Sequence, residues 1–322
     1  MVRQARIDLP GHLYHVIARG IEQRDIFVDH KDYADFLTRL EEGLDRTGGK
    51  CFAFCLLPNH FHLLILRGHR PLAELMRRLM TGYAVRFNLR YKRSGHLFQN
   101  RYKAILCDRD SYFLELIAYI HLNPLRAGLV RDLSGLRKYK WCGHSTLLGG
   151  NIHKFLARED ILREFGSHLR SAMRGYESFV SDRANRFKHG ELSGGGLVKS
   201  MREVQSSDGR ELMAKEKTEI SDARILGGGL FVESVLRKVE NEQYRKVPLE
   251  EVIDQVEKRS GVKFEEIASK SQARHVVKAR AMYCHLAKER CAVSGGQLMR
   301  QLKLTSGAIS HLIYKGRDLF SS

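Results

Sequence analysis

Apolar residues along the first 125 positions follow two different spacings. Residues 11–20, the two apolar runs on either side of Pro58–Asn59, and residues 97–108 are rich in aromatic and β-branched side chains. Glycine, proline or asparagine residues punctuate these runs. This composition and punctuation predict four strands, the middle two joined as a hairpin.

Three other stretches carry apolar side chains at helical spacing. Residues 30–48 stop at two glycines, residues 71–93 begin with a proline, and residues 108–123 run from capping aspartates to Pro124, as helices do. The order β-α-β-β-α-β plus a further helix predicts an α+β fold with a ferredoxin-like (RRM-like) antiparallel sheet. Its two helices would cover one face of the sheet and leave the other open for a ligand.

The rest of the chain has a different character. Residues 151–248 combine linker-like stretches with short helical patterns, whereas residues 249–322 are almost entirely helix-forming. Residues 293–316 predict two short helices around a tight turn, the helix-turn-helix pattern. We therefore divide the chain into a domain at 1–150, a helical or linker connection at 151–248 and an all-helical domain at 249–322.

The composition adds a charge that the apolar pattern does not show. The formal charge of +18 divides into +10 for residues 1–150, +3 for 151–248 and +5 for 249–322. Basic surfaces at both ends favour nucleic acid as the partner. The sequence shows no basic membrane anchor, no signal-like apolar stretch and no CxxC pair. We therefore expect a soluble, cytoplasmic protein that binds no membrane and holds no zinc through cysteines.

Two histidines interrupt an apolar strand in LLPNHFHLLI (56–65). Because residues i and i+2 of a strand point to one face, His60 and His62 would project together onto the open face, with Phe61 turned toward the helices. Two neighbouring imidazoles can share one metal cation and leave positions for other ligands. Two hydrogen-bonded histidines at a strand end would give the same sequence.

The helix at 108–123 carries groups that would complete such a metal site. Tyr119 and Asn123 lie four residues apart and therefore share a helix face. A hard cation such as Mg²⁺ or Mn²⁺ accepts an amide oxygen beside imidazoles, and the tyrosine oxygen could then attack a phosphate held there. A core aromatic residue is the plainer interpretation of Tyr119. Tyr112 is a competing nucleophile, and Glu115 is an additional candidate ligand.

Four stretches, in this order, resemble the single-tyrosine HUH transposases, especially the REP-associated tyrosine transposases (RAYTs): ARIDLPGHLYHVIARGIEQRDIF, LLPNHFHLLI, LFQNRYKAIL and YIHLNPLRAGLV. The resemblance implies that His60, His62 and Asn123 bind the metal, with Phe61 in the hydrophobic position, and that Tyr119 is the catalytic tyrosine. Members of that family nick single-stranded DNA near hairpins, form a 5′-phosphotyrosine link with a free 3′-hydroxyl, and rejoin strands without ATP.

Basic side chains on the long helix and the last strand suit a phosphate backbone. The candidates for DNA contact in this domain are Arg77, Arg78, Arg86, Arg90, Lys92, Arg93, Arg101 and Lys103. For any single one of them, a solvated surface charge is the simpler explanation. Tyr83, Phe87 and Tyr91, at four-residue spacing on the same helix, are expected in the core.

The C-terminal stretches SKSQARHVVKARAMYCHLAKE (269–289) and LMRQLKLTSGAISHLI (298–313) resemble the DNA-binding domain of the replication initiator DnaA. The resemblance implies duplex DNA as partner, with phosphate contacts from Lys270, Arg274 and Lys278 and base contacts from Thr305, Ser306, Ser310 and His311. LTSGAISH departs from the initiator's recognition helix, so its own DNA box is not the expected target. A helical module for self-association is the alternative.

Two other functions fit parts of the sequence. A ferredoxin-like binding module would hold RNA or DNA without cutting it, but it would normally carry stacked aromatic residues on adjacent strands. A domesticated transposase would act as a non-cutting regulator that binds its own DNA repeats through residues 249–322. The sequence leaves open the target DNA, the physiological metal, and whether Tyr119 acts within one chain or across a homodimer.

Overall fold

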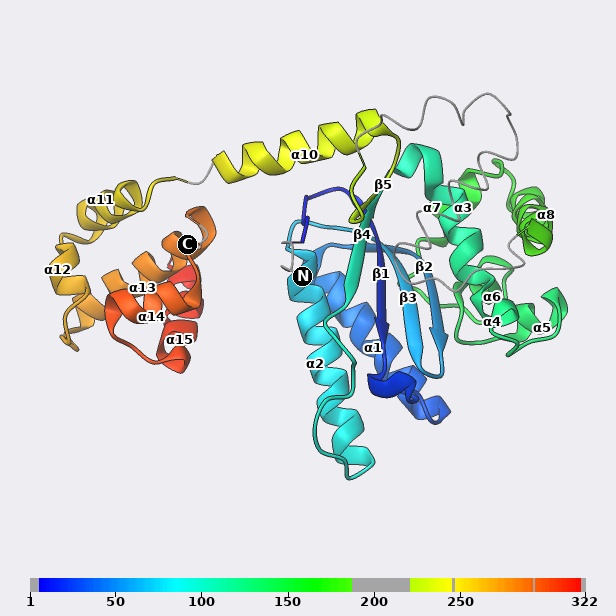
Figure 1. The fold of residues 1–322 in the computed structure, drawn as a ribbon, viewed down its shortest axis with the longest axis horizontal. Helices are drawn as coiled ribbons and strands as arrows, with labels where there is room; N and C mark the ends of the chain where they lie inside the picture. The colour runs from blue at the N-terminus through cyan, green and yellow to red at the C-terminus, as the bar shows by residue number, and fades with distance from the viewer. Residues whose placement is uncertain (1–5, 187–220, 245–246, 292, 320–322) are drawn as a thin grey trace. The chain divides into compact units, whose positions relative to one another are not determined.

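The computed structural model describes residues 6–186, 221–244, 247–291 and 293–319. The chain forms two compact units, Met1–Val235 and Leu236–Ser322 (Figure 1). The first unit contains the sheet, and the second is built from helices.

The sheet of the first unit has the strand order of a ferredoxin-like fold. β1 lies between β3 and β4, β2 lies beside β3, and all of these pairs are antiparallel. The bounds are β1 Leu13–Arg19, β2 Lys50–Leu57, β3 His60–Leu66 and β4 Lys103–Cys107. The predicted α+β class is confirmed, and the four strands fall inside the stretches that the apolar pattern marked.

A fifth strand makes the sheet mixed where a purely antiparallel sheet was expected. β5 (Ile225–Leu226) pairs in parallel with Leu106 and Cys107 of β4, and both of its side chains are buried. A two-residue strand has no alternating pattern, so the sequence did not reveal it.

Two helices cover the face of the sheet that carries Phe61. They are α1 (His30–Thr47) and α2 (Leu72–Arg90). The Phe61 and Phe36 ring centroids lie 4.8 Å apart, and Tyr83 of α2 meets Phe36 at 5.3 Å. Phe61 is therefore turned toward the helices, as predicted.

The sequence around α1 explains where this helix begins and ends. Asp29 forms a capping box with Asp32, so two otherwise unpaired backbone N–H groups are satisfied at the first turn. Gly48 ends the helix at φ 66°, a left-handed conformation that glycine adopts without steric penalty.

The opposite face of the sheet is covered over β2 and β3, which corrects the expectation that the whole face is open. Helix α3 (Arg109–His121) packs on β2 and β3, and α4 (Asn123–Arg126) and α6 (Gly143–Leu147) also contact β2. α3 is apolar on nearly all sides, and eight of its 13 residues are buried. A helix of this composition cannot remain at a surface, so it closes over the sheet.

Further helices hold α3 in place. They are α5 (Leu133–Lys138), α7 (Arg158–Arg163) and α8 (Leu169–Arg186). The hydroxyl oxygen of Tyr176 on α8 lies 2.8 Å from Nδ1 of both His121 and His144. Glu115 of α3 pairs with Arg183 of α8 at 2.6 Å. The described part of the predicted connection at 151–248 thus packs largely within the first unit.

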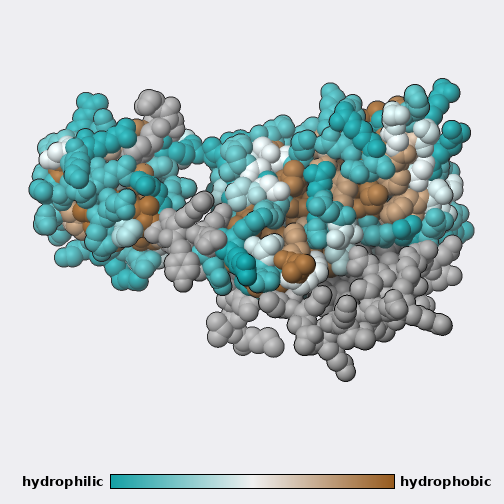
Figure 2. All heavy atoms as spheres, turned by 90° about the horizontal axis from the view of Figure 1, so that it is seen from above, coloured by the Kyte–Doolittle hydropathy of each residue, from teal (hydrophilic) through white to brown (hydrophobic). Residues whose placement is uncertain are grey.

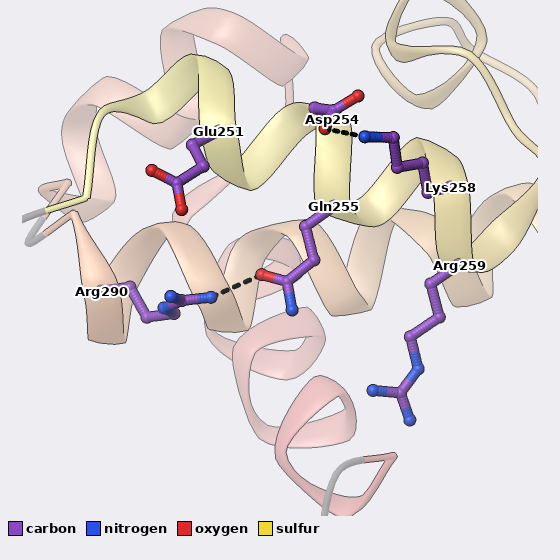
Figure 3. Close-up of a pocket in the computed structure, with 6 residues that line it drawn as sticks. All are labelled: Glu251, Asp254, Gln255, Lys258, Arg259 and Arg290. Carbon is purple, nitrogen blue, oxygen red and sulfur yellow. Dashed lines mark hydrogen bonds and ion pairs between the residues drawn. The ribbon is translucent and has the colours of Figure 1, made fainter.

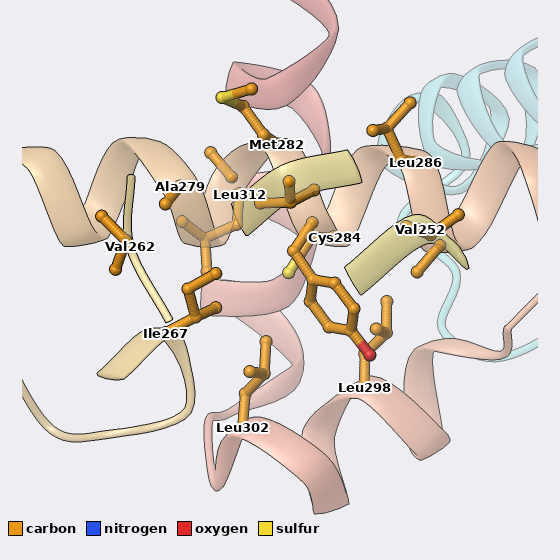
Figure 4. Close-up of a cluster of buried hydrophobic side chains, with 14 of the residues drawn as sticks. Val252, Val262, Ile267, Ala279, Met282, Cys284, Leu286, Leu298, Leu302 and Leu312 are labelled. Carbon is orange, nitrogen blue, oxygen red and sulfur yellow. The ribbon is translucent and has the colours of Figure 1, made fainter. Parts of the chain in front are cut away.

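The second unit has its own apolar core (Figure 4). Its helices are α11 (Leu249–Ser260), α12 (Phe264–Ile267), α13 (Arg274–Arg290), α14 (Gly295–Leu302) and α15 (Ser306–Asp318), while α10 (Gly229–Tyr244) spans the division at Val235. α14 begins with a capping box at Ser294, and Thr305 caps α15 after a turn in which Lys303 has φ 52°. The two predicted short helices around a tight turn are therefore present.

The surface differs between the units. In the view of Figure 2 the second unit shows mostly hydrophilic side chains, whereas apolar side chains gather on part of the visible face of the first unit. Among the described residues, none of the helices combines the length and the apolar composition needed to cross a membrane.

Candidate active site

The register of the sheet groups several polar side chains on the face beneath α3. Arg19 of β1 is opposite His60, and Ile17 is opposite both His62 and Lys103. Directly paired residues share a face of the sheet. His60, His62, Arg19 and Lys103 therefore belong to one face, and His15 joins them because it lies two residues from Ile17.

The two predicted histidines lie close together, and each has a hydrogen-bonding neighbour at Nδ1. The His60 and His62 ring centroids are 5.2 Å apart. Nδ1 of His60 lies 2.6 Å from Oδ1 of Asn59, and Nδ1 of His62 lies 3.0 Å from Nε2 of His15. His62 and His15 are buried, whereas His60 is partly exposed. In both rings the far nitrogen, Nε2, is thereby the one available for a ligand.

The surroundings keep these histidines neutral. Burial lowers the pKa of His60 to about 4, helped by the charge of Arg19, and lowers the pKa of His15 to about 3, helped by Lys103. Burial also lowers the pKa of His62 well below its usual value. A neutral imidazole is the form that binds a metal.

Tyr119 lies next to this histidine cluster. Its ring centroid is 6.0 Å from that of His15 and 6.3 Å from that of His62, both in edge-to-face arrangement. The guanidinium carbon of Arg126 lies 4.9 Å from the Tyr119 ring centroid. Burial raises the pKa of the Tyr119 phenol, while the charge of Arg126 opposes that rise.

Asn123 is the first residue of α4, one turn beyond Tyr119. Its Nδ2 donates to the backbone oxygens of Tyr119 at 3.0 Å and Ile120 at 3.2 Å. Because the amide nitrogen is used in this way, the carbonyl oxygen Oδ1 is the atom that remains for an outside partner. The described residues contain no group of three His, Cys, Asp or Glu side chains that could hold a metal, so a third protein ligand would have to be such an amide.

The two competing candidates on α3 are arranged differently. Tyr112 lies seven residues before Tyr119, about 10 Å along the helix axis, and is buried. Glu115, the additional candidate ligand, is bound by the guanidinium of Arg183 on α8. Its carboxylate therefore serves to join the two helices.

The candidate DNA contacts on α2 lie on the far side of the sheet from Tyr119. α2 packs with α1 against the Phe61 face, whereas His62 and Tyr119 belong to the opposite face. Several of the basic candidates in and after α2 are exposed, namely Arg77, Arg78, Arg86, Lys92 and Arg101. Lys103 differs from them because the register of β4 places it on the histidine face.

Arg90 and Arg93 have partners within the protein. Arg90 pairs with Asp29 and with the buried Asp32, the latter at 2.8 Å, and Arg93 lies 5.7 Å from the Phe87 ring centroid. Two carboxylates already neutralise Arg90, which makes it a weaker candidate for a phosphate. Tyr83 and Phe87 are buried as expected, while Tyr91 is partly exposed and donates to Asp32 at 2.8 Å.

The C-terminal candidates are accessible. Exposed side chains belong to Lys270, Arg274, Lys278, Thr305, Ser306, Ser310 and His311. Thr305 caps α15 through its side chain. Arg280, which is 3% exposed, donates to the backbone oxygens of Ile267, Ser269 and Ser271 and so fixes the loop that carries Lys270.

A separate hollow on the second unit is lined only by residues of α11 and α13 (Figure 3). Lys258 pairs there with Asp254 at 2.7 Å, and Arg290 donates to Gln255. Its lining mixes acidic and basic side chains and includes no residue of α14 or α15.

Three residues of the first unit were missed by the sequence analysis: His15, Arg19 and Arg126. The two-residue period of YHVIAR would have placed His15 and Arg19 on one strand face. Arg126 follows Tyr119 by seven residues, which is two helical turns. Their proximity to His60, His62 and Tyr119 depends on strand register and on the packing of α3, which the sequence did not supply.

Comparison with known proteins gives two findings for this part of the chain. A solved structure described as "Structure of the REP associates tyrosine transposase bound to a REP hairpin" aligns with 48% of this chain and 90% of its own, with 13% identity and a TM-score of 0.39. No curated protein matches the chain. Residues 9–123, which contain His60, His62, Tyr119 and Asn123, match the family model described as "Transposase IS200 like". Over these residues the chain is similar to the IS200-like transposases, as its motifs predicted.

Proposed function

We propose that the first unit nicks and rejoins single-stranded DNA, at or near hairpins, with Tyr119 as the nucleophile. The observation that carries this proposal is the edge-to-face contact of Tyr119 with His62, beside a second histidine and among the cations Arg19, Lys103 and Arg126. Burying a phenol beside two neutral histidines in a purely structural core would cost free energy, because each polar group loses its hydration. It suits a site that meets a phosphodiester.

The residues present fit a divalent metal, Mg²⁺ or Mn²⁺. His60 and His62 would bind it through Nε2, and Asn123 through Oδ1. Asn59 and His15 support the two histidines from behind, as hydrogen-bonding neighbours of metal-bound histidines commonly do. When bound, the metal would polarise the phosphoryl oxygens and orient the phosphorus. Among the described residues, none is a hydrogen-bond partner for the buried Nδ1 of His15. A buried polar atom without a partner is costly in a core, which favours a role for His15 in the site.

The chain's own residues would carry out the transfer. The Tyr119 oxygen forms a bond to phosphorus, the bond from phosphorus to the 3′-oxygen breaks, and a 5′-phosphotyrosine and a free 3′-hydroxyl result. The phenol gives up one proton to solvent and the leaving oxygen takes one up, so no net proton is consumed. One phosphodiester replaces another, so the reverse reaction needs no ATP.

Positive charge around Tyr119 would hold the DNA backbone. Arg19 and Lys103 lie on the same strand face as the histidines: Arg19 is opposite His60, and Lys103 is opposite Ile17, which separates it from His62. Cations in such positions attract phosphates and make binding dependent on salt. The exposed residues on and after α2 would add a more distant contact for the same strand.

For the second unit we propose binding to duplex DNA. The exposed Ser306, Ser310 and His311 share the outer side of α15, and Lys270 is presented on the loop that Arg280 fixes. A helix in the major groove with flanking phosphate contacts has this distribution of side chains. As further parts of the proposal, the protein acts in the cytoplasm, and a homodimer is one way to bring two nicking sites together.

Labelled hairpin oligonucleotides with Mg²⁺ or Mn²⁺, analysed on denaturing gels for a covalent adduct, test the nicking proposal. We expect a metal-dependent adduct with the wild type and with Tyr112→Phe, and none with Tyr119→Phe. An adduct that survives in Tyr119→Phe would contradict the assignment of the nucleophile. Tight binding without any adduct would favour a non-cutting regulator of repeat sequences.

A further inference from the structure

Arg126 is the charged side chain that contacts Tyr119 directly. Its guanidinium carbon lies 4.9 Å from the phenol ring centroid, and its charge acts on both Tyr119 and His62. The charge of Arg19 acts on His60 and His62, and that of Lys103 acts on His15. Arg126 thus contacts the proposed nucleophile, and its charge also acts on the candidate metal ligand His62.

The backbone fixes this arrangement. The N–H of Arg126 donates to the oxygen of Leu122 at 3.0 Å, and the N–H of Leu122 donates to that of Ala118 at 2.9 Å. α4 therefore continues from α3 with hardly a break, and Asn123 ties the two together through its bonds to the Tyr119 and Ile120 oxygens. Arg126 and Tyr119 lie two turns apart on one short, rigid stretch.

Exposure gives Arg126 a second property. Tyr119 has no exposed surface, whereas Arg126 is partly exposed. The guanidinium beside the buried phenol is therefore the part of this pair that solvent reaches. Guanidinium is always charged and offers five N–H donors, enough to bond to a phenol oxygen and a phosphate oxygen together.

We propose that Arg126 is a catalytic residue of the nicking reaction, donating to the Tyr119 oxygen and to a non-bridging oxygen of the scissile phosphate. This inference rests on the proposed function. As the Tyr119 oxygen loses its proton to solvent and bonds to phosphorus, negative charge passes from the phenol oxygen to the phosphoryl oxygens, and the bond to the 3′-oxygen breaks. Arg126 keeps its own proton, and its N–H groups stabilise the negative charge first on the phenol oxygen and then on the phosphoryl oxygen. Fixed donors at the point where charge develops are worth about 100- to 1,000-fold in rate.

The test compares Arg126→Gln and Arg126→Lys with the wild type in single-turnover adduct formation. The oligonucleotide dissociation constant and the melting temperature are measured on the same samples. Arg137→Gln is the matched control, because Arg137 is an exposed arginine on α5 paired with Glu177. We expect Arg126→Gln to react about 100-fold more slowly at saturating DNA, with binding within about 3-fold of wild type, and Arg126→Lys to recover part of the rate because it restores the charge.

Three outcomes would contradict the role of Arg126 or the function on which it rests. A rate for Arg126→Gln equal to that of wild type, or faster, would overturn the proposal, because Arg126 would then only cover Tyr119. A loss explained by weaker DNA binding or by a lower melting temperature in both variants would overturn it too. Failure of the wild type to form any adduct would contradict the proposed nicking function itself, and not merely the role of Arg126.

Discussion

The two units use polar side chains in opposite ways. In the first, His15 and His62 of the sheet and Tyr119 of α3 are buried side by side among apolar residues. In the second, the core is almost wholly apolar (Figure 4), and the polar candidates for DNA contact lie on the outside of α13, α15 and the loop before α13. Chemistry on a phosphate benefits from fixed, dehydrated groups, whereas recognition of a duplex needs accessible ones.

This difference predicts that the two functions can be broken separately. The largest effect is expected for His62→Gln in the first unit. Loss of this buried imidazole should bring metal-dependent adduct formation below detection, because His62 is both a candidate metal ligand and a neighbour of Tyr119. Duplex DNA binding by the same variant, measured by fluorescence anisotropy, should stay within about 2-fold of wild type, a difference of only about 0.4 kcal/mol. Weak duplex binding would show that the two units are not independent.

A smaller effect is expected at His15, whose ring lies next to Nδ1 of the candidate metal ligand His62. His15→Ala removes the neighbour of His62 Nδ1, and loss of such a partner typically weakens metal affinity by about 10- to 100-fold. Titration with Mn²⁺ followed by electron paramagnetic resonance measures this without any DNA. His12→Ala is the matched control, because His12 lies just before β1 and its ring nitrogen Nδ1 is 2.8 Å from the backbone oxygen of Pro10. Equal Mn²⁺ affinity in His15→Ala and wild type would show that His15 does not support metal binding.

Acid should destabilise the first unit through its buried histidines. Burial lowers the pKa of His144 to about 4, so below pH 6.5 the unfolded chain takes up a proton that the folded chain refuses. Stability is therefore complete above about pH 6.5 and falls as the pH drops toward 4, by about 2 kcal/mol at pH 5. Urea unfolding at pH 7 and pH 5 should show a smaller pH effect in His144→Gln. His96→Gln, at an exposed histidine, should leave the pH effect unchanged.

The smallest effect is expected at the exposed cations of the second unit. Replacement of Lys270, Arg274 and Lys278 by glutamine should lower the salt dependence of duplex binding by a slope of about 2 to 3, since each phosphate contact contributes about 0.9. Lys258→Gln with Arg259→Gln, on α11 away from α14 and α15, is the control pair. An unchanged slope in the triple variant would favour self-association as the role of this unit.

The local elements were predictable because their patterns are local. The aromatic and β-branched composition of β1 and β3, the capping aspartate of α3 and the glycine after α1 all appear in a few consecutive residues. Short-range periods also placed His60 and His62 on one face of a strand and Tyr119 one helical turn from Asn123. The turn between α14 and α15 was likewise predictable from consecutive residues.

The remaining features depend on contacts between distant segments. α3 closes a face that was expected to be open, because its apolar residues needed burial and α6 and α8 were there to pack around it. The bond between His15 and His62 joins residues 47 positions apart, and the pairing of Arg90 with Asp29 and Asp32 joins α2 to the start of α1. β5 adds to β4 from beyond residue 220. No short-range pattern encodes such neighbours.

The most direct test of the central claim is to identify the amino acid that carries the DNA. The covalent adduct of wild-type protein with a hairpin oligonucleotide would be digested with nuclease and trypsin and sequenced by tandem mass spectrometry. We predict a phosphonucleotide on Tyr119 within the peptide of residues 110–126. The same modification on Tyr112 of that peptide, or on a residue elsewhere in the chain, would contradict the site described above.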